Sequence, residues 1–220
     1  MKENPADNLI QLKKLYLALK PGIETRLKEF SLIGKSIKKE TLFPELAFCL
    51  FTPQSKAKSC WKAVCTLKEK GLLHSGKPAR IEKIVSDSGV RFKKNKTGYL
   101  IESRGKYAGV AKKISEYVGG GISIYELREW LVDNIKGYGY KEASHFLRNI
   151  GFGQELAILD RHILKNLKSL GAIKEVPASI TPAKYLEMEI VLQKFARKAG
   201  IPVAHFDLLL WAKEAGEIFK

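Results

Sequence analysis

Two residues of this chain, Lys141 and Asp160, have types and positions that could perform covalent chemistry. Lys141 directly follows the stretch "IKGYGY" (135–140) and opens an amphipathic segment, and Asp160 lies inside the apolar run "ILDRHIL" (158–164). The dipole of a helix disfavours a cation in its first turn, and burial disfavours it further, so both effects would favour a neutral amine at Lys141. A neutral amine can attack a sugar carbon or form a Schiff base, whereas an ammonium cannot.

Asp160 precedes an amphipathic segment and is therefore a good N-cap for a helix. A cap holds its carboxylate rigidly at a helix start, where the carboxylate can face a cleft. There it could stabilise an oxocarbenium-like sugar cation or help to activate a nucleophile, as carboxylates do in glycosidic cleavage. Simpler interpretations stay open, because Lys141 could be one of many solvated surface lysines and Asp160 could be only a cap.

The segment around Lys141 has the pattern of a helix-hairpin-helix, with the turn "IKGYGYK" between two amphipathic stretches. Gly137 and Gly139 are expected to adopt positive φ and to let the backbone approach another molecule closely. The unpaired N–H groups at the start of the second helix form a natural phosphate site, and Lys136 adds positive charge. Such contacts position DNA without reading its sequence. The alternative is an ordinary turn between two core helices.

The charge of the chain indicates a polyanionic partner. Its 220 residues carry a formal net charge of +16, and lysine and arginine are spread along the sequence rather than gathered in a tail. Such a field attracts polyanions, of which nucleic acid is the commonest. Ribosomal and membrane-surface proteins share this composition, so charge alone does not decide between these classes.

No pattern for a metal or an organic cofactor is present, and we expect none. The three cysteines, Cys49, Cys60 and Cys65, are too few for an iron–sulfur cluster and suggest no disulfide framework. The four histidines lack metal-ligand spacing such as H-x-x-x-H. No signal-peptide segment and no apolar run near 18 residues is found, so we expect a soluble, intracellular protein with no membrane partner.

Helical periodicity runs through almost every segment and predicts an all-α protein of two helical lobes around a cleft. The first helix is expected from Asn8 to Leu19, where Pro21-Gly22 would end it, and a second from Ile23 to Leu32. One lobe, residues 41–149, would end in the hairpin. The other would combine residues 1–40 with residues 150–220.

A family resemblance rests on two of these stretches. "LREWLVDNIKGYGYKEASHFLRNIG" (127–151), followed by "LAILDRHIL" (156–164), resembles the helix-hairpin-helix (HhH-GPD) superfamily of DNA glycosylases. Its bifunctional members place a lysine just after the hairpin and an aspartate about this far downstream, where Lys141 and Asp160 stand. The loop "FGQELA" (152–157) departs from the superfamily pattern, because it has no proline. Within the superfamily, the chain is most similar to the archaeal-type 8-oxoguanine DNA glycosylase/AP lyase family.

Three further stretches carry the resemblance to this family over roughly residues 45–220. "LFTPQSKAKSCWKAV" (50–64) is similar to the segment that inserts into the DNA stack, with Gln54 as the wedge. "GVRFKKNKTGYLIESR" (89–104) is similar to a family helix start, which implies that Phe92 lies near the base pocket. "FDLLLWAKEAGEIFK" (206–220) resembles the C-terminal recognition helix, which implies that Asp207, Trp211 and Lys220 line the pocket.

The chemistry of the last helix agrees with this implication. Asp207 and Trp211 share a face at i, i+4, and an aspartate is a poor fit for a purely apolar face. A flipped base is held by stacking and by hydrogen bonds to its edge, which a tryptophan and a carboxylate can supply. The alternative is a core tryptophan beside a surface aspartate.

The resemblance implies an enzyme of base excision repair that acts as a monomer on double-stranded DNA containing 8-oxoguanine. It would excise the base through a Schiff base on Lys141 and cleave the strand by β-elimination, with Asp160 assisting and without a metal or organic cofactor. Two alternatives are an oxidised-pyrimidine glycosylase/lyase of the same fold and a non-catalytic helix-hairpin-helix DNA-binding protein.

Overall fold

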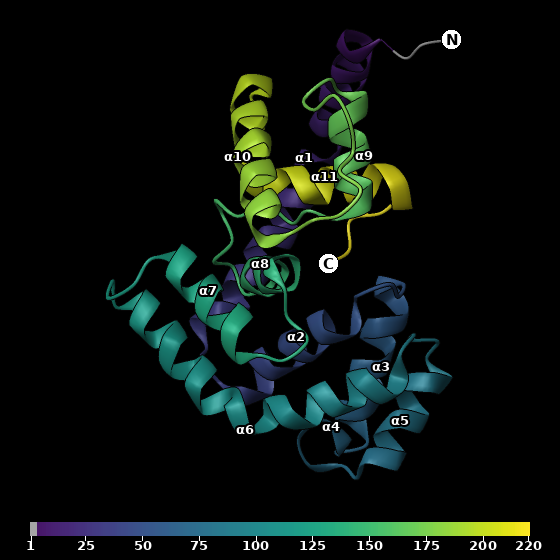
Figure 1. The fold of residues 1–220 in the computed structure, drawn as a ribbon, viewed down its shortest axis with the longest axis vertical. Coiled ribbons are helices and arrows are strands. Elements are labelled where there is room, and N and C mark those ends of the chain that lie inside the picture. Colours follow the sequence, from purple (N-terminus) through teal and green to yellow (C-terminus); the bar gives the residue numbers. More distant parts are fainter. Residues whose placement is uncertain (1–3) are drawn as a thin grey trace.

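The computed structural model describes residues 4–220, and every regular element in that range is an α-helix, which confirms the predicted fold class. The helices are α1 (Pro5–Lys35), α2 (Lys39–Phe51), α3 (Ala57–Glu69), α4 (Leu72–Ser75), α5 (Pro78–Asp87), α6 (Lys93–Val118), α7 (Ile124–Asn134), α8 (Tyr140–Asn149), α9 (Arg161–Ser169), α10 (Pro182–Ala199) and α11 (Val203–Ala215). Figure 1 shows them gathered in two bodies, with α8 and the C-terminal end of the chain between them.

Two clusters of buried apolar side chains correspond to these two bodies. The first cluster is formed by α2 to α8 and runs in sequence from Leu42 to Leu156. The second is formed by α1 and by α9 to α11, with members such as Ile23, Leu164 and Phe206. The division into folding units 41–149 and 1–40 with 150–220 stays a prediction, and residues 1–3 lie outside the described residues.

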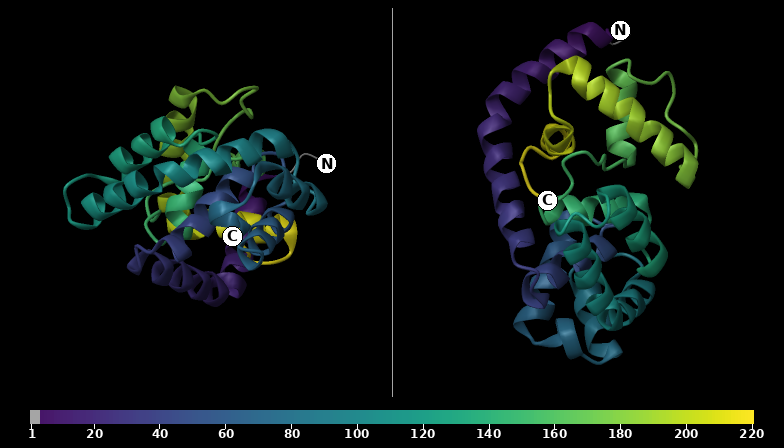
Figure 2. Two further views of the ribbon diagram at one scale, coloured as in Figure 1. Left: turned by 90° about the horizontal axis from the view of Figure 1, so that it is seen from below. Right: turned by 90° about the vertical axis from the view of Figure 1, so that its left-hand side faces the viewer.

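The expectation that Pro21-Gly22 ends the first helix is wrong, because α1 continues through both residues. A proline inside a helix loses a backbone hydrogen bond and costs about 3 kcal/mol. Packing offsets this cost, since Ile23 and Phe30 beyond the proline are buried and each such side chain contributes about 1.5–3 kcal/mol. Gly22 allows close contact, because a Cβ there would lie 2.8 Å from Cδ1 of Ile218. Figure 2 shows α1 as a long, bowed helix along one side of both bodies.

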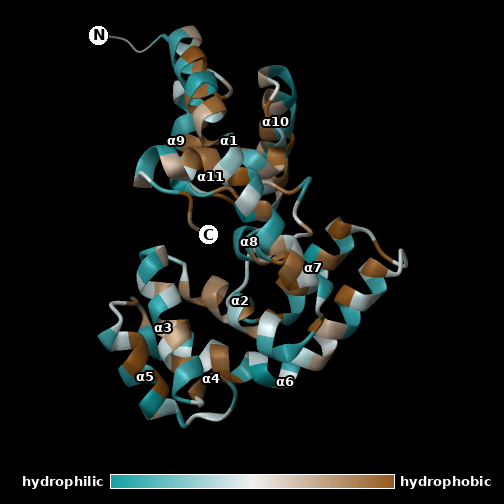
Figure 3. Ribbon diagram, turned by 180° about the vertical axis from the view of Figure 1, so that it is seen from behind, coloured by the Kyte–Doolittle hydropathy of each residue, from teal (hydrophilic) through white to brown (hydrophobic). Residues whose placement is uncertain are grey.

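Most helices are amphipathic, with polar and apolar residues on different faces. In Figure 3, teal and brown segments alternate along most helices, as expected where one face packs on a core and the other faces water. Within residues 4–220, no helix combines the length and the apolarity that crossing a bilayer demands.

A buried ion pair joins the two bodies. Arg128 on α7 donates from Nη1 and Nη2 to the two carboxylate oxygens of Glu189 on α10, at 2.7 and 2.8 Å. Both side chains are buried. Bidentate pairing of this kind is strong and directional, and the loss of one partner would leave a buried charge unpaired. The pair therefore fixes α7, which leads into the hairpin, against α10.

Candidate active site

Lys141 lies in the first turn of α8 with its side chain 23 % exposed. Its Nζ donates to the hydroxyl of Thr52 at 3.3 Å and lies 3.5 Å from Oε1 of Glu142. The Thr52 hydroxyl in turn donates to the carbonyl oxygen of Cys49 at 2.9 Å, which orients its lone pairs toward the lysine. The amine is therefore held at a defined place and stays reachable from solvent, unlike that of a freely solvated surface lysine.

The hairpin between α7 and α8 contains one of the two predicted positive-φ glycines. Gly137 has φ +92°, and a Cβ there would lie 2.5 Å from Cδ2 of Tyr99. Gly139 has φ −110° and ψ −174°, so the prediction of positive φ is wrong for this residue. The reason is that Gly139 is the N-cap of α8, a position with extended backbone. Its N–H donates to Oε2 of Glu142 at 3.2 Å.

Lys136 extends from the same hairpin on the surface. Its Nζ lies 3.5 Å from Oε2 of Glu102 on α6, and both side chains are exposed. An exposed pair of this kind contributes at most about 1 kcal/mol, so the lysine can exchange the carboxylate for a phosphate at little cost. The DNA contact of Lys136 stays a prediction.

Asp160 is the N-cap of α9, as its position in the sequence predicts. Its Oδ1 accepts hydrogen bonds from the backbone N–H groups of His162 and Ile163, both at 2.8 Å. No hydrogen bond within residues 4–220 uses its Oδ2. The carboxylate is therefore fixed through one oxygen while the other oxygen is available to a ligand.

The segment that precedes Asp160 is held by α10. Glu189 accepts from the backbone N–H of Ala157 at 2.8 Å, and Tyr185 donates its hydroxyl to the carbonyl oxygen of Ala157 at 2.6 Å. Glu189 is also the partner of Arg128, so one carboxylate ties this segment to the helix that leads into the hairpin. A single connected network thus positions the chain segments that carry Lys141 and Asp160.

Gln54 and Phe92, both predicted to contact DNA, share an uncommon backbone conformation. They are the two non-glycine residues with positive φ among residues 4–220, at 54° and 58°. A non-glycine residue in this region stores strain, and such residues cluster at functional sites. Both side chains are exposed, that of Phe92 by 51 %. The two predicted contacts are therefore strained positions on the surface.

Asp207 and Trp211 on α11 do not form a core tryptophan beside a surface aspartate, so that alternative is wrong. Asp207 is 8 % exposed and Trp211 is 37 % exposed. Oδ2 of Asp207 lies 3.2 Å from Nη2 of Arg148 on α8. Burial raises the pKa of Asp207, the charge of Arg148 lowers it, and the carboxylate of Asp160 raises it. The last effect shows that the two carboxylates lie within electrostatic reach of each other.

Lys220 turns its side chain into the junction of the two bodies. Its Nζ donates to Oε1 of Glu45 on α2 and lies 3.7 Å from the centroid of the Trp61 ring. Burial lowers the pKa of Lys220, whereas the charge of Glu45 and its hydrogen bond raise it. Asn149 on α8 donates to the other oxygen of Glu45 at 3.0 Å. The lysine side chain is therefore ordered by groups from α2, α3 and α8.

Several buried polar atoms around α8 have no hydrogen-bond partner among the described residues. They include Nε and Nη1 of Arg148 and Oδ1 of Asn149, and Oδ2 of Asp207 has only its ion pair with Nη2 of Arg148. Buried polar groups in folded proteins are nearly always hydrogen-bonded, and each exception calls for an explanation. A cluster of such atoms at the junction offers donors and acceptors to the polar edge of a ligand.

The contacts bring predicted site residues together in two separate pairs. Lys141 touches the loop that carries Gln54, and Asp160 interacts electrostatically with Asp207. Within residues 4–220, no side-chain hydrogen bond or ion pair joins the other predicted residues to these four; they are Lys136, Gly137, Gly139, Phe92, Trp211 and Lys220.

Sequence reasoning missed other polar residues at this junction, namely Glu45, Thr52, Glu142, His145 and Arg148. Glu45 has a signal, because it is the one charged residue in the apolar run "LFPELAFCLF" (42–51). His145 and Arg148 lie in an amphipathic segment, where the sequence excludes His145 as part of a metal site but gives neither residue a role. Charged or ring-nitrogen groups inside such runs are costly to bury, so they would have indicated the site.

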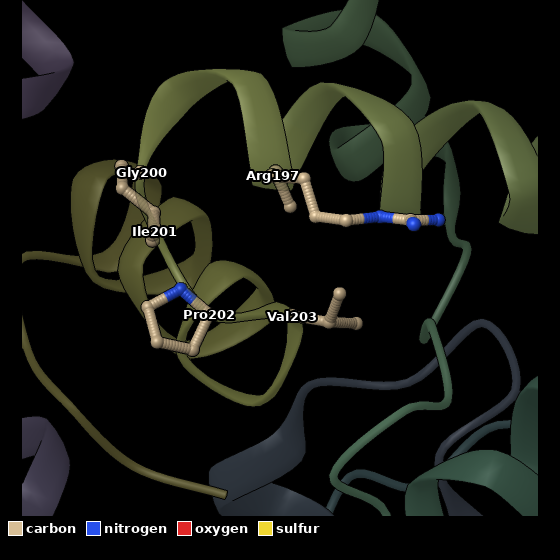
Figure 4. Close-up of a pocket in the computed structure, with 6 residues that line it drawn as sticks. Arg197, Gly200, Ile201, Pro202 and Val203 are labelled. Carbon is tan, nitrogen blue, oxygen red and sulfur yellow. The ribbon is translucent and has the colours of Figure 1, made fainter.

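A surface pocket lies elsewhere, at the corner between α10 and α11 (Figure 4). It is lined by Arg197, Pro202 and Val203 among others, and by none of the candidate site residues. In the described part of the chain, no group of three or more His, Cys, Asp or Glu side chains could hold a metal ion. The candidate site is therefore the junction around α8, where Lys141 and the unpaired polar atoms lie.

The sequence as a whole matches proteins of one kind. A family model described as 8-oxoguanine DNA glycosylase matches residues 23–201. A protein of Fusobacterium nucleatum named 8-oxoguanine DNA glycosylase/AP lyase is 44 % identical over 221 residues and is covered in full, as is this chain. A protein of the same name from Korarchaeum cryptofilum is 36 % identical over 90 % of each chain.

Solved structures share the fold over nearly the whole chain. The 8-oxoguanine DNA glycosylase of Thermotoga maritima has a TM-score of 0.87 at 32 % identity, over 99 % of this chain and 100 % of that chain. The 8-oxoguanine glycosylase/lyase of Methanocaldococcus jannaschii, in complex with a 15mer DNA containing 8-oxoguanine, has a TM-score of 0.85 at 30 % identity, over 96 % and 99 %. The similarity thus includes both bodies of the fold.

Proposed function

Because this chain belongs to the 8-oxoguanine DNA glycosylase family, we propose that it excises 8-oxoguanine from duplex DNA and cleaves the strand as an AP lyase. Lys141 is the nucleophile and Asp160 its electrostatic partner. The observation that carries this assignment is the place of Lys141, a partly buried amine held by Thr52 in the first turn after the hairpin. Such an amine can form a covalent intermediate with a sugar carbon once it is neutral.

The reaction begins when the amine of Lys141 attacks C1′ of the damaged nucleotide. The N–C1′ bond forms as the glycosidic bond breaks, and the electron pair of the broken bond leaves with the base, which takes up a proton. Asp160 stabilises the positive charge that develops on the sugar, and it needs no rearrangement because its Oδ1 is fixed at the start of α9. Opening of the sugar ring gives a Schiff base. Loss of a C2′ proton then expels the 3′ phosphate by β-elimination.

The base must leave the DNA stack before this chemistry can begin. Gln54 fills the place of the extruded base, and Phe92 and Trp211 offer exposed aromatic faces for stacking. Asp207 and Lys220 line the pocket for the base. Extrusion costs a few kcal/mol, which stacking and edge hydrogen bonds offset.

The hairpin, with Lys136, Gly137 and Gly139, holds the DNA backbone through its phosphates. We further propose that the enzyme acts as a monomer on DNA inside the cell, with both bodies in contact with one duplex.

Borohydride trapping tests the proposal directly. A duplex with 8-oxoguanine opposite cytosine is incubated with the wild type, Lys141→Gln or Lys136→Gln in the presence of borohydride, which reduces a Schiff base to a stable adduct. We expect a covalent adduct with the wild type, none with Lys141→Gln, and an adduct at saturating protein with the control Lys136→Gln. Absence of an adduct with the wild type would refute the Schiff-base mechanism.

A second duplex separates the proposal from its alternative substrate. The same proteins are incubated with a duplex that contains thymine glycol, an oxidised pyrimidine. We expect excision of 8-oxoguanine to be much faster. Preferential cleavage of the thymine glycol duplex would instead identify an oxidised-pyrimidine glycosylase/lyase.

A further inference from the structure

Lys96 on α6 is a buried lysine for which the reaction above has no role. Its residue is 3 % exposed. Its Nζ donates to the carbonyl oxygens of Phe51 and Pro53, both at 2.7 Å, and to the hydroxyl of Ser55 at 2.9 Å. An ammonium has three N–H donors, so all three are taken by one short segment, residues 51–55.

This segment carries two residues that the proposed reaction uses. Gln54, the wedge, lies between two of the acceptors and has positive φ. Thr52, which accepts the hydrogen bond from Lys141, lies between Phe51 and Pro53, whose carbonyl oxygens are the other pair of neighbouring acceptors. The hydroxyl of Ser55 also accepts from the backbone N–H of Arg91 at 3.0 Å, next to Phe92. Lys96 therefore joins the wedge segment, the contact of the nucleophile and the segment before α6.

The charge of Lys96 is costly to bury, and its hydrogen bonds explain why it is tolerated. Burial lowers the pKa of Lys96 to about 8; Cys60 raises it, and the charges of Lys141 and Arg91 lower it. At neutral pH the ammonium is thus the main form and makes charge-assisted hydrogen bonds, which are stronger than neutral ones. An apolar side chain would leave these three acceptors without this donor, so the lysine stabilises one particular conformation of residues 51–55.

We propose that Lys96 is a positioning residue for base excision, whose ammonium holds residues 51–55 in the conformation that presents Gln54 to the DNA stack. This proposal rests on the proposed function. Without the ammonium, the segment relaxes from its strained conformation, because three acceptors lose their common donor. Extrusion of a paired base then fails more severely than chemistry at a site that has no base to extrude.

The test compares two lysine variants on two substrates. Lys96→Met keeps the length of the side chain and removes the donors, and Lys94→Met, at an exposed position two residues earlier, is the control for loss of one charge from α6. The substrates are a duplex with 8-oxoguanine opposite cytosine and a duplex with a preformed abasic site. We expect Lys96→Met to slow single-turnover excision of 8-oxoguanine by up to about 100-fold, as misplacement of about 1 Å can do.

Trapping at the abasic site is expected to stay within a few-fold of the wild type in Lys96→Met. Lys94→Met should resemble the wild type on both substrates. A 2-aminopurine placed beside the lesion, whose fluorescence rises when its neighbour is unstacked, should respond to the wild type and to Lys94→Met but not to Lys96→Met. This readout distinguishes positioning of the wedge from a general loss of structure.

Excision by Lys96→Met at the rate of Lys94→Met would overturn the proposal, and so would an equal loss on both substrates. Ser55→Ala removes one acceptor of Lys96 and keeps both carbonyl contacts. It should slow excision of 8-oxoguanine selectively, to a smaller extent than Lys96→Met, and it replaces Lys96→Met in the test if that variant does not fold. If the wild type fails to trap the abasic site, the proposed function fails instead. The 2-aminopurine signal still reports on Lys96 in that case.

Discussion

Asp160 has a structural role as the cap of α9 and a proposed chemical role, and a conservative substitution can separate the two. Asparagine caps helices about as well as aspartate, so Asp160→Asn keeps the hydrogen bonds to His162 and Ile163 and loses the charge. We expect single-turnover excision to slow by about 10²–10³-fold, the usual effect of removing one preorganised electrostatic group. The free energy of unfolding in urea should be unchanged.

Asp160→Ala is the matched control, because it removes both the charge and the cap. It should lose about 1 kcal/mol of stability and excise as slowly as Asp160→Asn. Excision by Asp160→Asn at the wild-type rate would leave Asp160 with the role of a helix cap alone.

His145 makes the stability of the fold depend on pH. Burial, together with the positive charges of Arg148, Lys141 and Lys220, holds the pKa of His145 well below its usual value of 6.5. In the unfolded chain this histidine therefore binds a proton near pH 6.5, whereas in the folded chain it stays neutral. The free energy of unfolding consequently decreases as the pH falls below 6.5. The contribution reaches about 1.4 kcal/mol per pH unit.

The variant His145→Leu should abolish this contribution. Urea unfolding at pH 7.5, 6.5 and 5.5 measures the slope of stability against pH, and the variant should have the shallower slope below pH 6.5. Burial also lowers the pKa values of His74 and His205, but both residues are present in both proteins. Parallel slopes for the two proteins would contradict a buried, neutral His145.

At the scale of elements, the hairpin depends on one glycine more than on the other. Gly137 has positive φ and no room for a Cβ beside Tyr99, whereas Gly139 has extended backbone and its Cβ would lie 3.3 Å from the flexible end of Glu142. Gly137→Ala should lower the free energy of unfolding by more than about 1–2 kcal/mol, the cost of the left-handed conformation for a residue with a Cβ. Gly139→Ala should cost about 1 kcal/mol or less. Urea unfolding of the pair checks this order, and equal costs would refute it.

The elements around the hairpin could be predicted because their signals are local. Apolar spacing, the glycines and the cap at Asp160 indicate α7, α8 and α9 within short windows of sequence. The continuity of α1 through Pro21 could not be predicted in this way. It depends on the burial of Ile23 and Phe30 against helices from the other end of the chain, which no local window contains.

At the scale of the molecule, the site is made by contacts between distant parts of the chain. Glu45 meets Lys220, Arg148 meets Asp207, and Lys141 meets Thr52. The places of Lys141 in the first turn after the hairpin and of Asp160 at a helix cap could be predicted, because both signals are local in the sequence. The contacts between distant residues could not be predicted, because they form only when the two bodies pack. A charged residue in an apolar run, such as Glu45, indicates a special position but not its partner. The candidate site therefore exists only in the assembled fold.

The charge of the whole molecule leads to a prediction about binding. With a net charge of +16, the protein should bind duplex DNA mainly through phosphate contacts that release counterions. The logarithm of the binding constant should then fall linearly with the logarithm of salt concentration, with a slope of about −0.9 for each phosphate contacted. Lys136→Gln should make the slope shallower by about 1, since Lys136 lies on the hairpin.

Lys13→Gln is the matched control, because it removes the same charge from an exposed position near the N-terminal end of α1, in the other body. Figure 1 shows that end of α1 at the far side of the molecule from α7. Fluorescence anisotropy over a salt series, in a Lys141→Gln background that prevents turnover, gives the slopes. A long-range effect of net charge alone would change both variants equally, and a slope near zero would exclude phosphate-dominated binding. A change confined to Lys136→Gln would place a phosphate at the hairpin, because only a direct contact loses its own counterion.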